Sequence, residues 1–461
     1  MGIKETLQLV QRKEMDIRLA EISFCGTDYD HPPDSENTDA LLYTDLIGLF
    51  KASETLQSPF KSLIMEITEH DGHAPVCIIS DMFLGWTVQV ALELGIFHSM
   101  FIAGNGYSMG IYFSISMNPS LWQTDDEEFS LADFPEAGKI KQARVSVDLK
   151  FVDGADIIFS FWLQLFSFCL CSDVILLNTM ERIGQNGVKY FSRKIGGKPV
   201  WTTGPLINSE CKQRGTLAEK IAFNGFSYSQ WLGLHPPASV LYISFGSQNT
   251  ISLPQMNQLA MGLEASGKPF IWVARPPLEF SVTEEFNADW LPEGFEERIR
   301  AENQGMLLHK WPPQQEILSH KSTGALLSHC GWNSIIESLC QGVPIIGWPL
   351  AGEQLFNSQM LEEEVGVCIE VVNGSRPYVV KHEHTTQVIK TVMDETEKGE
   401  EMRRKASEIR KKMKDAITDG GEGFKGSSIK ALDEFVSMVI STTKISVPSM
   451  EVDSIVHPLN D

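Results

Sequence analysis

The chain has 461 residues, of which 43% are hydrophobic, and it carries a net charge of −22. This length is typical of two ordinary domains, and the hydrophobic content is sufficient for large cores. The 60 acidic residues outnumber the 38 basic ones, which argues against a surface that binds nucleic acid or an anionic membrane. A local basic pocket is not excluded by the net charge.

Short β-branched runs alternate with longer helical patterns along the chain. Several of these runs are apolar throughout, as expected for parallel strands that are covered on both faces. The alternation predicts an α/β fold of the doubly wound type. The predicted strands are Ile17–Phe24, Val76–Ser80, Val174–Asn178, Val240–Phe245, Phe270–Ala274, Met306–His309, Ala325–His329 and Val343–Trp348.

One apolar run, Ile157–Ser172, raises the question of a membrane span. It has 16 residues and contains Gln164, whereas a spanning helix needs about 20 apolar residues. We therefore expect a buried helix and no membrane span. The N-terminal residues are charged and amphipathic, unlike a secretory signal. Most of the eight cysteines lie in apolar runs, which suits a reducing, cytoplasmic compartment.

The predicted organisation has two domains and a linker. A polar stretch without clear periodicity follows residue 203, so we assign a first domain to residues 1–203, a linker to 204–230 and a second domain to 231–430. A charged helix is predicted over Asp394–Asp415, with its charges on a solvated face. The region 431–461 is predicted to hold a C-terminal helix, with a mobile tail after Ile440. Cys169 and Cys171 lack further ligands at zinc spacing, so no metal site is predicted.

The most informative segment runs from Trp311 to Gln354. In it, the apolar run Ala325–Ser328 meets the short turn His329–Gly331, and a helix then begins at Trp332. Free backbone N–H groups and the helix dipole make such a helix N-terminus an anion site. The strand within Ser239–Ser247 ends in a similar Gly-Ser turn. The pattern predicts a phosphate site where these strands end.

Side chains around this turn suit a nucleotide. Trp311, at the end of a strand, can stack on a flat base, although taken alone it is better explained as a core aromatic. Glu337 lies one helical turn beyond Ser334, where a carboxylate accepts hydrogen bonds from ribose hydroxyls; taken alone it is better explained as an exposed helix residue. His329, Asn333 and Ser334 can each donate to a diphosphate.

A second strand-end loop supplies groups for a sugar. Glu353 and Gln354 are adjacent polar residues that follow the strand ending near Trp348. Two such side chains can grip the hydroxyls of a sugar. The combination of a base stack, a ribose acceptor, phosphate donors and a sugar clamp is far more specific than any of its parts.

The segment strongly resembles the 44-residue signature of plant family 1 UDP-glycosyltransferases. The resemblance implies the GT-B architecture, in which two Rossmann-like domains face each other across a cleft. It also implies inverting O-glucosylation of a small hydroxylated aglycone (phenolic, flavonoid or hormone-like) from UDP-glucose, by a monomer without metal or cofactor. The matching residues are Trp311, Gln314, His329–Ser334, Glu337, Gly342–Pro344, Trp348–Pro349 and Glu353–Gln354, with further matches in Val240–Ser247, Phe270–Pro277 and Leu291–Arg298.

The resemblance assigns residues to each part of UDP-glucose. Trp311 and Pro312 are implied to contact uracil, and Gln314 and Glu337 are implied to bind the ribose. The residues implied to hold the diphosphate are Ser247, His329, Asn333 and Ser334, and those implied to contact the sugar are Trp332, Glu353 and Gln354. Glutamine at position 354 resembles glucose users of the family. Pro312 departs from the family, which has a small residue there whose N–H can meet uracil. Because proline has no N–H, we expect a modest weakening of binding.

Only half of the family's catalytic pair is matched. Asp81, just after an apolar strand, matches the aspartate that orients the base histidine, with a buried capping role as the alternative. In the family that histidine follows the first strand, but Ile17–Phe24 resembles the third strand. The first strand, its loop, its helix and the second strand are therefore unmatched. The other N-terminal histidines, none of which matches, are His31, His70, His73 and His98.

The unmatched strands have structural and functional consequences. In the strand order 3-2-1-4-5, strand one pairs with strand four, so strands three and four would face a gap whose open edges are costly. We expect either a longer N-terminus or a rearranged N-terminal half.

The alternative function is that of a truncated or degenerate member that binds UDP-sugar with little or no catalysis. A nicotinamide-dependent oxidoreductase is disfavoured because no G-x-G-x-x-G motif follows a strand. The candidate acceptor contacts are Phe83, Trp86, Tyr107 and Phe113.

Overall fold

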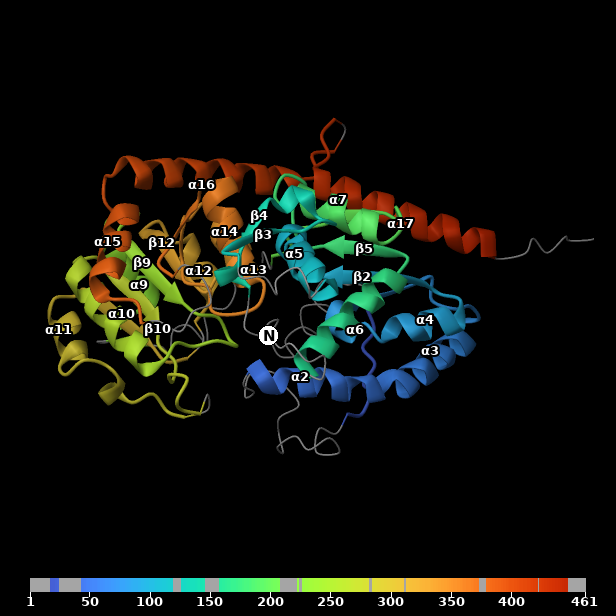
Figure 1. The fold of residues 1–461 in the computed structure, drawn as a ribbon, viewed down its shortest axis with the longest axis horizontal. Helices are drawn as coiled ribbons and strands as arrows, with labels where there is room; N and C mark the ends of the chain where they lie inside the picture. The colour runs from blue at the N-terminus through green and yellow to red at the C-terminus, as the bar shows by residue number, and fades with distance from the viewer. Residues whose placement is uncertain are drawn as a thin grey trace, which may run out of the picture.

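The computed structural model describes residues 17–24, 43–118, 126–145, 157–207, 222–223, 226–281, 284–310, 312–372, 379–421 and 423–446. Within these residues, two parallel β-sheets with helices on both faces stand side by side (Figure 1). Two short antiparallel pairs accompany them, β3 (Glu128–Ser130) with β4 (Lys139–Lys141), and β7 (Ala222–Phe223) with β8 (Phe226–Ser227). The α/β prediction is confirmed.

The first sheet has the strand order β1-β2-β5-β6, and all of its pairs are parallel. Its strands are β1 (Cys77–Asp81), β2 (Phe97–Ile102), β5 (Val174–Leu177) and β6 (Val200–Thr202). The helices around it are α2 (Tyr43–Ala52), α3 (Gln57–Asp71), α4 (Thr87–Leu94), α5 (Gly106–Met117), α6 (Ile157–Cys171), α7 (Gln185–Lys194) and α17 (Ser427–Ser446).

The second sheet has the parallel strand order β11-β10-β9-β12-β13-β14. Its strands are β9 (Val240–Ser244), β10 (Phe270–Val273), β11 (Gly305–Leu308), β12 (Thr323–Ser328), β13 (Ile345–Gly347) and β14 (Cys368–Glu370). The helices around it are α9 (Tyr228–Gly233), α10 (Leu253–Ser266), α11 (Phe295–Ala301), α12 (Gln314–Ser319), α13 (Trp332–Cys340), α14 (Gln354–Met360), α15 (His382–Met393) and α16 (Glu397–Ala416). Every residue of β9, β10, β11 and β12 is buried, as the uniformly apolar runs predict.

The predicted strand Ile17–Phe24 is wrong. This segment is extended but pairs with none of the strands that the structure describes, and the side chains of Ile17 and Leu19 are each 51% exposed. It contacts helices instead: Arg18 lies 3.7 Å from Asp71 at the end of α3, and Phe24 packs on α2. A strand needs a ladder partner for its backbone groups, and β1 stands at the edge of the described sheet. Among the described residues, no strand therefore pairs with the outer edge of β1, where the sequence predicts a gap.

The apolar run in the first half forms a buried helix, as predicted. It is α6, whose Phe161, Phe166 and Cys169 are buried in the core of the first half. In the described parts of the chain, no helix has both the length and the apolarity that crossing a bilayer requires.

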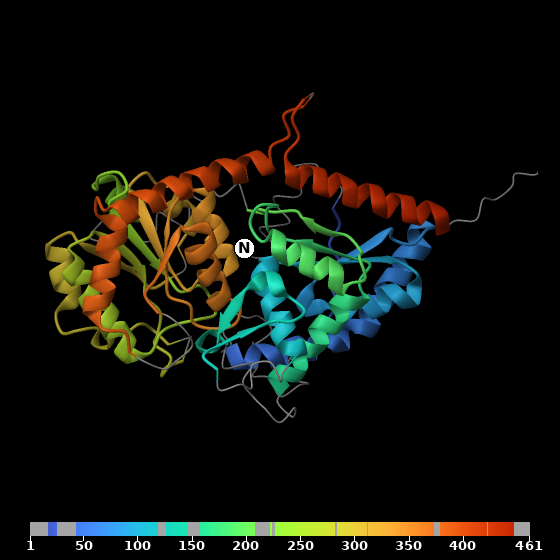
Figure 2. The same ribbon diagram turned by 45° about the horizontal axis from the view of Figure 1, so that its top comes forward.

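The C-terminal helices join the two halves. The predicted charged helix is α16, which begins at Glu397 because the Thr396 hydroxyl caps it by accepting from the Gly399 N–H at 3.0 Å. Helix α17 then returns to the first sheet (Figure 2). There Phe435 packs against Val174 and neighbouring residues. The predicted end of structure at Ile440 is wrong, because α17 continues to Ser446. Residues beyond 446 lie outside the described residues.

The halves share one apolar core across their junction. A single cluster of buried residues includes Ile102 and Met109 from the first half with Ile335, Phe356 and Met360 from α13 and α14. Hydrophobic burial on this scale is the main stabilising term in folded proteins. The cleft between the sheets is therefore built on a continuous core.

A buried ion pair crosses the same junction. Arg144 of the first half donates to both carboxylate oxygens of Glu370 on β14, at 2.6 and 2.7 Å, and to the Leu355 carbonyl at 3.1 Å. The Ser358 hydroxyl also donates to Glu370. Both charged side chains are at most 2% exposed. Burial alone would lower the pKa of Arg144, but the Glu370 carboxylate outweighs it and raises that pKa, so the guanidinium stays charged.

Candidate functional site

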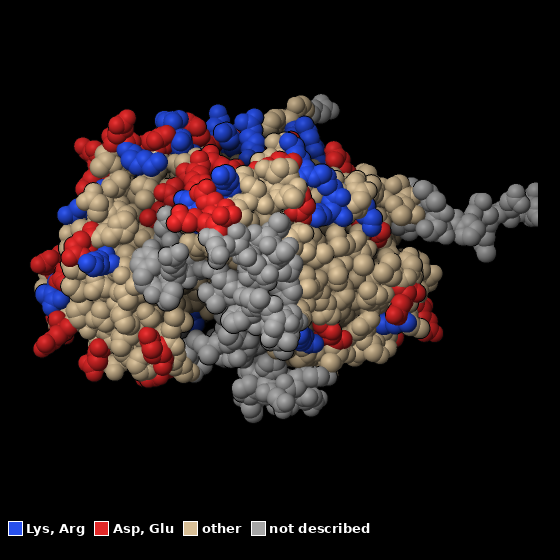
Figure 3. Space-filling model, in the orientation of Figure 1, with Lys and Arg blue, Asp and Glu red and all other residues tan. Residues whose placement is uncertain are grey.

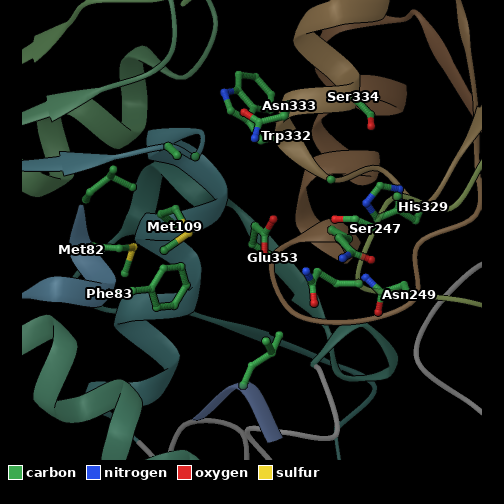
Figure 4. A pocket seen from close by; sticks show the side chains of 18 of the residues that line it. Met82, Phe83, Met109, Ser247, Asn249, His329, Trp332, Asn333, Ser334 and Glu353 are labelled. Carbon is green, nitrogen blue, oxygen red and sulfur yellow. The ribbon is translucent and has the colours of Figure 1, made fainter. Parts of the chain in front are cut away.

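A cavity of about 550 Å³ opens between the two halves (Figure 4). The first half contributes the end of β1, the loop after β2 and the helices α2, α5 and α6. The second half contributes the loops that follow β9, β12 and β13. Ligands of parallel α/β sheets bind at such carboxyl ends of strands. On the outer face drawn in Figure 3, acidic side chains gather near this junction, where α14 leads into η11 (Leu361–Val365).

The loop after β12 aims the N-terminus of α13 at the cavity. Cys330 adopts a left-handed conformation with φ of 64°. Its N–H donates to the Ser328 hydroxyl at 3.1 Å, and its carbonyl accepts from the Asn357 amide at 3.0 Å. These bonds hold the tight turn that the sequence predicts. Asn333 and Ser334, in the first turn of α13, line the cavity together with the free N–H groups of that turn.

His329 lies in a narrow slot at the base of this loop. The residue is 8% exposed, and its ring is bordered by two glycines: a Cβ on Gly246 would lie 2.7 Å from the ring, and one on Gly331 would lie 2.4 Å from Nε2. Nδ1 has no hydrogen-bond partner among the residues that the structure describes. Burial lowers the pKa of His329 to about 4, against a smaller opposing effect of the Ser244 backbone. The imidazole is therefore neutral near pH 7 and can donate one N–H to an anion.

Gly246→Ala is expected to weaken UDP binding about ten-fold, because backbone strain at a left-handed position and displacement of His329 add up to about 1–3 kcal/mol. Gly246 has φ of 76° and borders the ring. Isothermal titration calorimetry with UDP measures the change. Gly267→Ala is the matched control, because Gly267 has φ of 66° with nothing within 4 Å of its added Cβ. Equal UDP affinity in both variants would contradict the role of the slot.

The neutral state of His329 gives a pH prediction. His329→Ala should weaken UDP-glucose binding by the same factor at about pH 8 and about pH 5.5, because an imidazole with a pKa of about 4 changes charge at neither value. UDP-glucose is the suitable ligand because its diphosphate does not titrate in this range. If His329→Ala weakens UDP-glucose binding several-fold more at the lower pH than at the higher one, His329 binds as a cation.

The Glu337 carboxylate is held by amide groups at the edge of the cavity. The Gln314 amide donates to Glu337 Oε2 at 2.6 Å and to the Ser334 hydroxyl at 3.2 Å. The Tyr242 hydroxyl donates to Gln314 Oε1 at 3.3 Å. Burial raises the pKa of Tyr242, which keeps it protonated as a donor. Glu337 and Gln314 both line the cavity, so a fixed carboxylate faces a ligand that carries hydroxyl groups.

The loop after β13 presents two polar side chains. Glu353 occupies the position just before the first residue of α14 and projects into the cavity (Figure 4). The carbonyl oxygen of the Gln354 side chain accepts from the backbone N–H groups of Leu350 and Ala351, each at 3.1 Å. That arrangement leaves the Gln354 NH₂ group as the part that can donate to a sugar. The Trp332 indole N–H is already donated to the Asn178 carbonyl of the first half at 2.6 Å.

Asp81 lines the cavity from the first half. It is the last residue of β1, and its Oδ1 accepts from the Phe83 N–H at 2.9 Å. Burial raises the pKa of Asp81, with the Phe83 N–H opposing the shift. The carboxylate therefore faces a poorly hydrated space in which it is a stronger base than an exposed aspartate.

Aromatic rings form the wall next to Asp81. Phe83 stacks on Phe50 with ring centroids 4.4 Å apart, and Phe161 continues the stack at 6.1 Å from Phe50. All three rings line the cavity. A flat apolar molecule fits such a wall.

Three of the four predicted acceptor contacts are wrong. Phe83 lines the cavity, but Trp86, Tyr107 and Phe113 are at most 5% exposed and belong to the protein interior. The Trp86 indole donates to Ser53 Oγ at 3.1 Å, and the Tyr107 hydroxyl donates to the Ala137 carbonyl at 3.2 Å. Their polar atoms already have partners there, which explains how the fold tolerates their burial.

Most of the predicted site residues meet in one place. Pro312 is buried but is not among the described residues that line the cavity, and Trp311 and His31 lie outside the described residues. His98 is buried with a pKa lowered to about 4, and His70 and His73 are exposed near the end of α3. The predicted residues that line the cavity are Asp81, Ser247, Gln314, His329, Trp332, Asn333, Ser334, Glu337, Glu353 and Gln354.

Several residues of the site were not predicted from the sequence. Gln248 and Asn249 line the cavity just after Ser247, next to the Gly-Ser turn that the sequence predicts as part of a phosphate site. Arg275 donates to the Gly246 carbonyl at 3.2 Å and to the Ser247 carbonyl, so it holds that loop from a neighbouring strand end. Phe50 carries no motif, and only the fold brings it to the cleft.

Two facing α/β halves with polar loops at the carboxyl ends of their strands are typical of enzymes that bind a nucleotide-linked ligand between domains. Residues 220–411 match the family model described as "UDP-glucoronosyl and UDP-glucosyl transferase". The chain is 42% identical over 428 residues to UDP-glycosyltransferase 92A1 of Arabidopsis thaliana, covering 93% of this chain and 86% of that relative. It is 34% identical to crocetin glucosyltransferase 3 of Crocus sativus, covering 94% of this chain and 90% of that relative.

Solved structures agree with these relatives. The Glycyrrhiza uralensis UGT73P12 complexed with glycyrrhetinic acid 3-O-monoglucuronide has a TM-score of 0.80 at 25% identity, covering 96% of this chain and 88% of that one. The Phytolacca americana UGT2 complexed with UDP-2fluoro-glucose and pterostilbene has a TM-score of 0.71 at 27% identity, covering 90% of this chain and 84% of that one. The chain belongs to the plant family 1 UDP-glycosyltransferases and is an enzyme of that family with the GT-B fold.

Proposed function

We propose that this enzyme transfers glucose from UDP-glucose, with inversion, to a hydroxyl group of a small phenolic, flavonoid or hormone-like aglycone. The observation that carries the proposal is the composition of one cavity. Groups suited to ribose, diphosphate and sugar lie on one side of it, and Asp81 beside an aromatic wall lies on the other. We further propose that it acts as a cytoplasmic monomer without a metal or cofactor.

The ribose, the diphosphate and the glucose of the donor each have a proposed partner. Glu337 and Gln314 receive the ribose, while His329, Asn333, Ser334 and Ser247 surround the diphosphate. The neutral His329 and the first turn of α13 stabilise the negative charge that grows on UDP as it leaves. Glu353 and the NH₂ group of Gln354 grip the glucose hydroxyls.

The transfer is a single displacement. The acceptor oxygen forms a bond to the anomeric carbon while the bond from that carbon to the UDP oxygen breaks, and UDP leaves with the bonding electrons. The acceptor proton passes to a base on the Asp81 side of the cavity. We assign Asp81 to this proton transfer, either as the acceptor itself or as the carboxylate that orients a histidine base.

The names of the relatives support a glucose donor and a small aglycone. They include a scopoletin glucosyltransferase of Nicotiana tabacum, 31% identical over 442 residues, and an anthocyanin 3'-O-beta-glucosyltransferase of Gentiana triflora, 29% identical over 428 residues. Both named acceptors are flat and hydroxylated. The stacked wall of Phe50, Phe83 and Phe161 suits molecules of that shape.

One observation favours a second candidate function, that of a protein that binds UDP-sugar with little or no catalysis. Of the histidines that the structure describes, only His329 lines the cavity, and it lies on the donor side. The described residues therefore place no imidazole beside Asp81.

Turnover and binding measured together decide between the two. The purified chain is incubated with UDP-glucose and a panel of phenols, flavonols and coumarins, and glucosides are detected by mass spectrometry. The expected products are β-glucosides, which are identified by the NMR coupling constant of the anomeric proton. UDP-glucose binding is expected in calorimetry. Binding without product would favour the second candidate. Absence of binding of both UDP and UDP-glucose would show that the donor site is wrongly assigned.

A further inference from the structure

The Glu337 carboxylate is held from two sides. The Gln314 amide donates to Oε2 at 2.6 Å, and the amide of the next residue, Gln315, donates to Oε1 at 3.0 Å. Both glutamines lie at the start of α12, and Glu337 lies on α13. Each carboxylate oxygen thus receives one N–H and keeps further acceptor capacity for a ligand.

The two glutamines differ in their access to the cavity. Gln314 lines it and is also fixed by Tyr242 and Ser334. Gln315 is half-buried and is not among the described residues that line the cavity. Its side-chain amide donates to Glu337, so any effect of Gln315 on a ligand passes through that carboxylate.

A fixed carboxylate recognises a diol better than a rotating one. A glutamate side chain has several rotamers, and a ligand that selects one of them loses binding free energy to the ordering of that side chain. Two donors on opposite oxygens fix both the position and the plane of the carboxylate before the ligand arrives. The 2′- and 3′-hydroxyls of a ribose then meet an acceptor pair that is already oriented.

We infer that Gln315 is a positioning residue that acts through Glu337 to make the donor site selective for ribonucleotides over deoxyribonucleotides. The inference rests on the proposed function, in which Glu337 receives the ribose. Gln315 contributes by orienting the carboxylate, and its effect is therefore confined to ligands that carry ribose hydroxyls.

The test compares Gln315→Leu with the unchanged enzyme in calorimetric titrations with UDP and with 2′,3′-dideoxy-UDP. Leucine has nearly the same size and cannot donate to Glu337. We expect Gln315→Leu to weaken UDP binding roughly three- to ten-fold, in line with the cost of ordering one mobile side chain when the ligand binds. The affinity for the dideoxy nucleotide should stay unchanged, so the preference for UDP shrinks by the same factor.

Two further variants complete the experiment. Gln387→Leu, at an exposed glutamine on α15, is the matched control and should bind both nucleotides like the unchanged enzyme. Gln315→Glu places a second carboxylate against Glu337 and should lose more of the preference for UDP than Gln315→Leu does. Thermal unfolding of each variant checks that it is folded.

The outcomes separate this inference from the proposed function. If the unchanged enzyme binds UDP and the dideoxy nucleotide equally well, the assignment of Glu337 to the ribose is wrong, and the inference is overturned with it. If the unchanged enzyme prefers UDP but Gln315→Leu and Gln315→Glu keep the full preference, the inference alone is overturned. Equal weakening of both nucleotides by Gln315→Leu would also overturn it, because that result shows a general disturbance of the site.

Discussion

Asp81→Asn is expected to lower the turnover number for glucosyl transfer by about 100-fold or more, because general base catalysis contributes factors of that size. Asparagine has the same shape and its side-chain oxygen can still accept from the Phe83 N–H, which Asp81 accepts at 2.9 Å. The fold of the loop and the donor side are therefore preserved. Initial rates with a phenolic acceptor measure turnover, and calorimetry with UDP should show unchanged affinity. A variant that keeps more than half of the activity would remove Asp81 from the proton transfer.

The same substitution should stabilise the protein at neutral pH. Burial raises the pKa of Asp81 in the folded state above its value in the unfolded chain. The charged carboxylate therefore costs folding free energy once the pH exceeds the folded pKa, and this cost vanishes as the pH falls below the ordinary aspartate value of about 4. Asp81→Asn should melt at a higher temperature than the unchanged enzyme near pH 7, and the difference should close as the pH approaches about 4. A carboxylate kept at such a cost is typical of a functional site.

Arg144→Ala is expected to destabilise the protein by about 3–5 kcal/mol, because it leaves the Glu370 carboxylate buried without its cation. Both side chains are at most 2% exposed, and the pair joins the two halves of the molecule. Denaturant unfolding followed by circular dichroism measures the change in the free energy of unfolding. A loss below about 1 kcal/mol would show that water or another group readily replaces the guanidinium.

The chain contains a matched control for this prediction. Arg193 donates to both oxygens of Glu136 at 2.7 and 2.8 Å, with the same two-bond geometry, but its side chain is 47% exposed. Arg193→Ala should cost less than about 1 kcal/mol, as exposed ion pairs generally do. The double replacement Arg144→Met with Glu370→Leu should cost less than Arg144→Ala, because it removes both buried charges together.

The sequence predicted the second half of the molecule better than the first. The apolar runs of the second sheet each bury their residues on both faces, so periodicity was sufficient to find β9 to β13. Strand β2 was missed because His98 and Ser99 interrupt its apolar pattern. The burial of His98 is possible because its Nε2 bonds with Ser80 and Thr87 at 3.2 and 3.1 Å and its Nδ1 with Ser172 at 3.0 Å, contacts that only the folded chain supplies.

Strand β14 was missed for a related reason. A glutamate in a short run indicates an exposed position, yet Glu370 is buried because Arg144, 226 residues earlier in the chain, neutralises it.

The functional site was likewise predicted only where it consists of local sequence motifs. The donor loops are local motifs of strand, turn and helix, and they were found. The aromatic wall was not, because Phe50 and Phe161 meet Phe83 through tertiary packing alone.

The shared core beneath the cleft restricts how the enzyme can move. Swinging one half away from the other would expose Phe356 and Met360 to water and would separate Arg144 from Glu370. Each of these changes is costly, so a hinge motion of whole domains is disfavoured relative to movement of the loops that border the cavity. The two halves should also unfold together in a single cooperative transition. Substrate entry and product release would then depend on the opening of the loops that border the cavity rather than on a motion of whole domains.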